Sequence, residues 1–471
     1  MYSITLPPRE PGTSDAEWVQ HEIDSHESET VFELVGEFDF ANETVTVTRG
    51  LTLYGVAIEE SEEPTTIIIG GGERYDNVDD PEDPLIGANL GAFRVISDGP
   101  VVFQDLLFRR WIGEAVLVQA CDGLTVKRCY FTEPVPGSLG QRLGSLTFAN
   151  AVLANGGFCK GDLIFENNCG RFSYSGDMPN DEGLLACLDT NFSSMQASHN
   201  DLTGHDEGLE IIRNGWGLEN FDIPIILRDN TFTLLESLPI GWPGHAACMC
   251  LNNHNARTEI VDNSITLRGE GTAFALSGEH FEVRDNDLTL ESRWRVLNRR
   301  GPMMREYPTA FQLGTDLQPE GFGDLCSSVA NSWIVNNTIR GDGRYAIKMP
   351  KEMQVVNAEP VPNNSHDNHV LGNDLSGFRP SVASLYLTQL TSDNHCEGCF
   401  PGRSILDDGV INEGDNPEII NACPPVRVHT DATFKPDWRR WLWVIGGVTV
   451  GGSIYSLIRK ARETAHTKGG E

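Results

Sequence analysis

The chain repeats one short pattern: an apolar residue, two variable residues, Asn, one variable residue and a second apolar residue. The pattern lacks the 3.6-residue period of a helix, and its apolar positions are often β-branched or aromatic, which favours short strands. Because Asn is depleted inside strands and tolerates left-handed backbone, we expect it at a sharp bend between two strands. The repeated residues are Asn168, Asn200, Asn230, Asn263, Asn286, Asn337 and Asn373.

A second series alternates with the first, and each copy is a small residue followed by an apolar run, as at residues 151–153 and 273–276. Leu106 and Cys129 hold the Asn position in two earlier copies, and the shortest step between copies is 23 residues. A repeat of this length with variable insertions is typical of a solenoid, whose successive coils stack parallel strands into sheets. We therefore expect inward apolar ladders and a ladder of hydrogen-bonded Asn amides at one corner.

With this repeat, the sequence resembles the right-handed parallel β-helix, or pectin-lyase-like, superfamily over roughly residues 30–390. The resemblance implies an all-β fold, a right-handed parallel β-helix with an N-terminal cap. That superfamily includes lyases, hydrolases, epimerases and adhesins, so the fold alone does not select a function.

The polar and apolar patterns divide the rest of the chain. We expect a polar leader or cap, the β-helix, an irregular cap or linker, a single apolar helix and a polar tail, at residues 1–29, 30–390, 391–437, 438–460 and 461–471.

The apolar helix is expected to cross a membrane. Residues 441–458 carry no charged side chain, and their length is close to the about 20 residues that a bilayer requires. Gly447 and Gly451 form a small-residue pair that would let two such helices pack, which suggests a homo-oligomer. The alternative is a buried cap helix. The start of the chain lacks the features of a secretory signal, so we expect the β-helix in the cytoplasm, held by a single-pass C-terminal anchor.

Charge changes the picture of partners. The chain has 68 acidic and 35 basic residues and a formal net charge of −33, which argues against nucleic acid as a partner. The acidity is typical of a solvated surface, or alternatively of Ca²⁺ binding.

Several of the 11 cysteines, Cys129, Cys187, Cys248 and Cys250, lie at apolar ladder positions and are expected to be buried. His395, Cys396 and Cys399 resemble half of a Zn²⁺ site, although unpaired or disulfide-bonded cysteines are the stronger expectation. No cofactor is required by any of these patterns.

Candidate chemistry lies just before two copies of the second series. Asp181 precedes Gly183, and His205, Asp206 and Glu207 precede Gly208, which is close to one coil later. Adjacent coils are about 4.8 Å apart, so Asp181 and Asp206 should be neighbours. Two close carboxylates raise one another's pKa and can divide acid and base roles, or they can share Ca²⁺. The alternative is that these are ordinary exposed turn residues.

The most basic stretch of the body, residues 293–305, includes Arg299 and Arg300, which would complete such a site. By resemblance, acidic residues on a sheet face and a basic residue from a loop imply a polysaccharide lyase or a glycoside hydrolase. We therefore expect a membrane-tethered β-helix that binds or cleaves a carbohydrate-like polymer. The alternative is a non-catalytic scaffold whose surface docks another protein.

Overall fold

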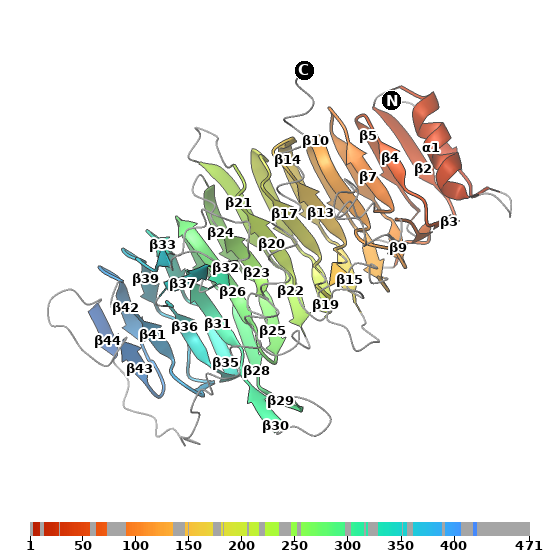
Figure 1. The fold of residues 1–471 in the computed structure, drawn as a ribbon. Helices are drawn as coiled ribbons and strands as arrows, with labels where there is room; N and C mark the ends of the chain where they lie inside the picture. Colours follow the sequence, from red (N-terminus) through yellow and green to blue (C-terminus); the bar gives the residue numbers. More distant parts are fainter. Residues whose placement is uncertain are drawn as a thin grey trace. The chain divides into compact units, whose positions relative to one another are not determined.

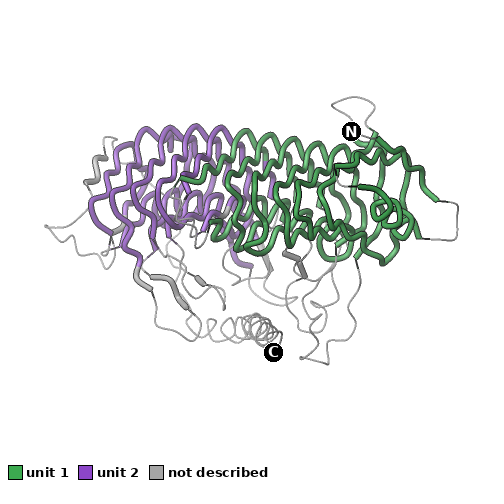
Figure 2. The backbone as a smooth tube through the Cα atoms, turned by 90° about the horizontal axis from the view of Figure 1, so that it is seen from above, with its two compact units in different colours: residues 1–231 green, residues 232–471 purple. Residues whose placement is uncertain are grey.

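The structure is a computed structural model that divides into two compact units, Met1–Thr231 and Phe232–Glu471 (Figure 2). It describes residues 3–9, 14–27, 29–56, 63–72, 91–134, 147–148, 150–172, 180–181, 183–204, 207–215, 222–234, 246–251, 256–296, 303–314, 317–318, 328–350, 352–355, 361–388, 391–406 and 418–421.

In unit 1, successive coils contribute strands to three parallel sheets, which we name A1, B1 and C1. Sheet A1 pairs β1 (Ser3–Leu6), β2 (Thr30–Leu34), β5 (Leu51–Tyr54), β8 (Val101–Gln104), the end of β10 (Val116–Lys127), β14 (Cys159–Glu166), β18 (Ser194–Ser198) and β21 (Ile223–Arg228). Sheet B1 pairs β3 (Glu37–Ala41), β6 (Ile67–Gly70), β9 (Leu107–Arg109), β11 (Tyr130–Thr132), β15 (Cys169–Arg171) and β19 (Asp201–Gly204). Sheet C1 pairs β4 (Val45–Val47), β7 (Phe93–Ile96), the start of β10, β13 (Val152–Asn155), β17 (Leu185–Leu188) and β20 (Leu209–Ile212).

Unit 2 has the same plan, with sheets A2, B2 and C2 (Figure 1). Sheet A2 pairs β24 (Ala256–Val261), β27 (Phe281–Arg284), β34 (Trp333–Val335), β39 (His369–Leu371), β42 (His395–Gly398) and β44 (Glu418–Asn421). Sheet B2 pairs β25 (Ser264–Arg268), β28 (Asp287–Glu291), β35 (Thr338–Gly343) and β40 (Phe378–Pro380). Sheet C2 pairs β23 (Ala246–Leu251), β26 (Thr272–Glu279), β31 (Thr309–Leu313), β36 (Tyr345–Lys348), β41 (Leu385–Leu387) and β43 (Ser404–Leu406).

The remaining strands are short. They are β12 (Thr147–Phe148), β16 (Asn180–Asp181), β29 (Arg293–Val296), β30 (Met303–Glu306), β32 (Leu317–Gln318), β33 (Val329–Ala330), β37 (Glu352–Val355) and β38 (Val361–Pro362). Strand β22 (Thr231–Leu234) belongs to the B sheet. The stacked parallel sheets confirm the predicted all-β solenoid, whereas the right-handed sense stays a prediction.

One helix, α1 (Asp15–Ser25), lies at the start of unit 1. The Ser14 hydroxyl accepts a hydrogen bond from the Ala16 amide at 3.1 Å, which caps the helix. Its buried face, which includes Val19 and Ile23, packs against β3 and β4. The predicted polar leader therefore contains one amphipathic helix.

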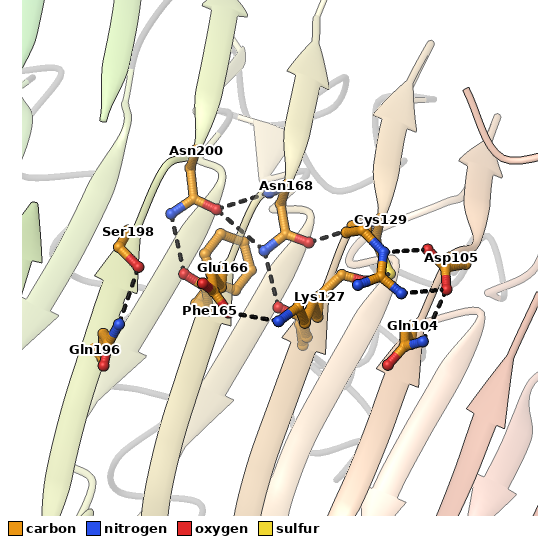
Figure 3. A network of polar contacts seen from close by, with 12 residues as sticks. Gln104, Asp105, Lys127, Cys129, Phe165, Glu166, Asn168, Gln196, Ser198 and Asn200 are labelled. Carbon is orange, nitrogen blue, oxygen red and sulfur yellow. Dashed lines mark hydrogen bonds and ion pairs between the residues drawn. The ribbon is translucent and has the colours of Figure 1, made fainter. Parts of the chain in front are cut away.

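The predicted Asn ladder is confirmed at the bend between the A and B sheets of each unit. In unit 1, the Asn168 Nδ2 donates to Asn200 Oδ1 at 3.1 Å, and Asn200 Nδ2 donates to Asn230 Oδ1 at 2.8 Å (Figure 3). In unit 2, the bonds from Asn263 to Asn286, Asn286 to Asn337 and Asn337 to Asn373 measure 2.9, 2.8 and 2.9 Å.

The expected cause of the bend was wrong in one detail. The left-handed residue is the one before each ladder Asn, as at His199 (φ 55°), Asp229 (φ 54°) and Asp285 (φ 59°). A ladder Asn must direct its amide inward to reach its neighbours, so the preceding, solvent-facing residue adopts the conformation that turns the chain.

The buried cysteines also behave as predicted. Cys129, Cys248 and Cys250 are at most 1% exposed, and burial raises the pKa of the Cys129 and Cys250 thiols to about 12. These side chains fill the core as small apolar groups.

The coils continue beyond residue 390, because β42, β43 and β44 pair with the A2 and C2 sheets. Residues 441–458, the predicted membrane span, lie outside the described ranges. Within those ranges, no helix has the length and apolar character needed to cross a bilayer.

Candidate functional face

Insertions concentrate beside the C sheets. Residues 73–90, 135–146 and 173–179 all precede strands of sheet C1, and residues 315–327 and 351–360 follow strands of sheet C2. By contrast, only residues 199 and 200 separate β18 from β19 at the Asn bend. Functional residues in solenoids favour faces bordered by insertions, so the outer faces of C1 and C2 are the candidates.

The structure brings together little of the predicted acidic cluster. Asp181 lies in β16, where its backbone pairs with Phe148, but its side chain lies outside what the structure describes. His205, Asp206, Arg299 and Arg300 also lie outside the described residues. Their convergence therefore stays a prediction. Glu207 is described, and its side chain is 8% exposed.

Glu207 belongs to a buried polar row that sequence reasoning missed. Val116, Val152, Leu185 and Leu209 are register partners on β10, β13, β17 and β20. The residues two positions before them, on four successive coils, form the row: Glu114, Asn150, Gly183 and Glu207. Asn150 Oδ1 accepts a hydrogen bond from the Gly183 amide at 3.1 Å. A Cβ at Gly183 would lie 2.5 Å from that oxygen, so only glycine fits between the two coils.

Glu114 is the most unusual member of this row. Its side chain is 3% exposed, and its Oε2 atom has no hydrogen-bond partner among the residues described. Burial raises the pKa of Glu114 to about 8, so the carboxyl group is mostly protonated at neutral pH. No spacing or motif around Glu114 signals this, because the burial comes from packing between coils.

The outer face of sheet C2 carries a solvent-facing row of functional groups. Register pairs Gln312 with Lys348 and Lys348 with Tyr386, on β31, β36 and β41. All three side chains are half-buried, and Lys348 Nζ donates to Gln312 Oε1 at 3.4 Å. An amide, an amine and a phenol therefore line up across three adjacent coils.

Aromatic and guanidinium groups extend this row toward the corner between B2 and C2. The rings of Tyr345 and Tyr386 are 5.5 Å apart, and the exposed Arg344 guanidinium lies 5.6 Å from the Tyr345 ring centroid. We call Gln312, Lys348, Tyr386, Tyr345 and Arg344 the C2 strip.

A sequence signal for this strip existed. The second-series copies read Ala310-Phe-Gln-Leu313 and Ala346-Ile-Lys-Met349, with a polar residue at the third, outward position. When the first, second and fourth residues of a strand are apolar, a polar third residue indicates the position that faces solvent and can contact a ligand.

An antiparallel hairpin, β29 with β30, precedes β31 and stands out from the stacked strands (Figure 1). Arg305 lies 5.9 Å from the Trp294 ring and 5.1 Å from the Tyr307 ring. Its guanidinium also donates to Asp342 Oδ2 at 3.1 Å and to Ser292 Oγ at 2.7 Å. Two members of the predicted basic stretch thus have structural partners, since Arg293 lies 4.0 Å from the buried Glu306.

The His395–Cys396–Cys399 segment does not bring its two sulfurs together as a thiol pair. Cys396 is buried, its thiol is free, and burial raises its pKa to about 12, whereas Cys399 is disulfide-bonded. Over the described ranges, no group of three or more His, Cys, Asp or Glu is arranged to hold a metal ion.

No protein-family model matches the chain, and no curated protein matches it. Among solved structures, it is similar to a mannuronic acid specific polysaccharide family 6 lyase from human gut microbiota, with 13% identity, a TM-score of 0.39, and coverage of 99% of this chain and 100% of the other. It is also similar to a family 6 polysaccharide lyase from Pseudopedobacter saltans, with 11% identity, a TM-score of 0.36 and coverage of 92% and 90%. A family 28 exopolygalacturonase from Yersinia enterocolitica gives 9% identity, a TM-score of 0.29 and coverage of 79% of each chain.

Proposed function

We propose that the protein binds a carbohydrate polymer along the C2 strip. The observation that carries this proposal is the alignment of Gln312, Lys348 and Tyr386 on adjacent coils, beside the exposed Arg344. Sugars are held by hydrogen bonds to hydroxyl groups and by apolar contact with aromatic rings, and the strip supplies both. Because successive coils repeat at about 4.8 Å, the row can follow an extended chain.

We also propose that the protein cleaves the polymer, as a lyase or a hydrolase. Lys348 and Tyr386 are the described groups on this face that can carry a proton to or from a sugar. The acidic cluster of Asp181, Asp206 and Glu207 with His205, Arg299 or Arg300 is the other proposed centre. Ca²⁺ at that cluster is a further proposal; Zn²⁺ is a weaker one.

The experiment compares Lys348→Ala with Lys127→Ala. Lys127 lies on sheet A1, where its amine contacts Glu166 at 2.9 Å, so it is the matched control. We expect the wild-type chain to bind either a mannuronic acid polymer or polygalacturonate, and Lys348→Ala to weaken that binding about 10-fold, the loss of one charge-assisted contact. Unsaturated or reducing ends released from the polymer would identify a lyase or a hydrolase. If neither polymer binds the wild-type chain, the proposal of carbohydrate binding fails, and the non-catalytic scaffold that docks another protein takes its place.

We propose, finally, that residues 441–458 tether the β-helix to a membrane from the cytoplasmic side. The support is their uncharged sequence, close to the length of a bilayer span. The full chain should sediment with membranes and resist carbonate extraction, while a chain ending at residue 437 should stay in the supernatant. A full chain that stays in solution without detergent would refute the tether.

A further inference from the structure

The β29–β30 hairpin is held by contacts at its base. An isolated two-stranded hairpin is marginally stable in water, so a projecting one needs anchors. Here Arg305 binds Asp342, which also forms an ion pair with Arg379 at 2.7 Å, and Arg293 lies 4.0 Å from the buried Glu306. These contacts fix the orientation of the hairpin on unit 2.

Large apolar side chains remain in solvent on this anchored hairpin. Trp294 and Met303 are each 60% exposed, and of the described large apolar side chains only Phe158, at 72%, is more exposed. Trp294 is the register partner of Arg305, so both side chains project from the same face of the hairpin. The guanidinium lies 5.9 Å from the indole centroid and restrains the ring, while more than half of its surface faces solvent.

This face of the hairpin leads into the C2 strip. Tyr307, which contacts Arg305, lies two residues before the start of β31. On the next coil, the Arg344 amide donates to the Pro308 carbonyl at 2.6 Å. The aromatic and guanidinium groups of the hairpin therefore lie one coil before Arg344 and Tyr345, on the chain that enters β31.

We propose that Trp294 is a stacking subsite for a pyranose ring of the polymer bound on the C2 strip, and that Arg305 positions the indole. This inference rests on the proposed function. The apolar face of a sugar ring packs on a flat aromatic surface, and a ring held in place in advance loses little entropy on binding. Replacing Trp294 should lower polymer affinity and leave the stability of the fold unchanged, because its indole is exposed to solvent.

A carbohydrate fits this site better than a lipid surface. The guanidinium beside Trp294 already binds Asp342 at 3.1 Å and Ser292 Oγ at 2.7 Å, so its hydrogen-bond donors are engaged in holding the hairpin rather than directed at an anionic headgroup. Of the described side chains on this face, Trp294 and Met303 are the exposed apolar ones and Arg305 lies beside the indole, which is less apolar surface than a helix that enters a bilayer presents.

The test measures polymer affinity by electrophoresis in gels containing the mannuronic acid polymer or polygalacturonate, using the full chain. We expect Trp294→Ala to weaken binding about 10-fold, and Trp294→Phe to retain most of it because a flat ring remains. Trp333→Ala is the control, because Trp333 is also exposed, at 46%, but lies on sheet A2. Unchanged thermal melting of each variant would show that the fold is intact.

The outcomes separate the two proposals. If the wild-type chain binds no polymer, the proposed function fails. If it binds and Lys348→Ala weakens binding while Trp294→Ala does not, the stacking subsite is refuted and the proposed function stands. If Trp294→Ala instead abolishes binding to phosphatidylserine vesicles and leaves polymer binding unchanged, the hairpin is a membrane contact and the inference is overturned.

Discussion

The outer faces of C1 and C2 have the same backbone plan but different side chains. In unit 1, register aligns Arg94, Leu117, Leu153, Ala186 and Glu210, so the middle of the row is apolar, and Leu117 and Ala186 are only 6% and 1% exposed. In unit 2, the comparable solvent-facing positions hold Gln312, Lys348 and Tyr386. The repeated positions build the coil, while the variable outward positions decide what each unit can bind.

The two units also differ in where they keep unusual polar groups. Unit 1 buries Glu114, Asn150 and Glu207 at the corner before sheet C1, whereas Gln312, Lys348, Tyr386 and Arg344 of the C2 strip stay in contact with solvent and Tyr345 is buried. Burial perturbs a titratable group through lost hydration, and exposure keeps it available to a ligand. Substitutions at the buried polar groups of unit 1 are therefore expected to change the free energy of unfolding, and substitutions in the C2 strip are expected to change ligand affinity.

The largest expected effect is at Glu114 of unit 1. Its pKa is about 8 in the folded state and 4.5 ordinarily. Between these two pH values the folded protein keeps a proton that the unfolded chain has released. That contribution is fully present below pH 4.5 and is lost as pH rises through 8, a change of about 3–5 kcal/mol. Glu114→Gln should remove this loss and be the more stable protein at pH 9, as measured by urea unfolding.

The matched control for this prediction is Glu166→Gln, which alters a half-exposed carboxylate paired with Lys127. Its unfolding free energy should follow the wild-type dependence on pH. A Glu114→Gln variant with the same pH dependence as wild type would show that Glu114 is ionised in the folded protein.

The next effect concerns the ladder that the two units share. Asn200→Leu in unit 1 and Asn286→Leu in unit 2 should each lower the free energy of unfolding by about 1–3 kcal/mol, because neighbouring buried amides lose partners. The exposed Asn42→Leu should change it little. If only one of the two variants is destabilised, the Asn ladder is not equivalent in the two units. If neither variant is destabilised, the ladder does not stabilise the fold.

The smallest effect on binding is expected for Tyr386→Phe in the C2 strip. The aromatic ring stays, so polymer affinity should change by about 2-fold or less, while kcat of any cleavage falls because the phenol proton is gone. Glu210→Gln, on the outward side of β20 in unit 1, should leave both quantities unchanged. An unchanged kcat for Tyr386→Phe would assign proton transfer to another group, such as the acidic cluster.

Much of the architecture could be predicted from local sequence. The Asn residues, the apolar runs and the buried cysteines follow from alternation over a few residues, since side chains in a strand point to opposite faces in turn. The predicted acidic cluster followed the same local logic, but Glu207, the member whose side chain is described, is buried rather than presented to solvent. Turn residues of similar composition can be buried or exposed, and only packing between coils decides which.

The sequence by itself determined the parallel coils, the corner that holds the amide ladder and the inward positions, because each depends on residues close in the chain. Only the tertiary structure decided that Glu114 keeps its proton, that Lys348 lies between Gln312 and Tyr386, and that Arg305 holds Trp294 beside Asp342. Those contacts join residues tens of positions apart, through insertions of unequal length. Their register is set by how successive coils stack, a property that no short stretch of the chain encodes.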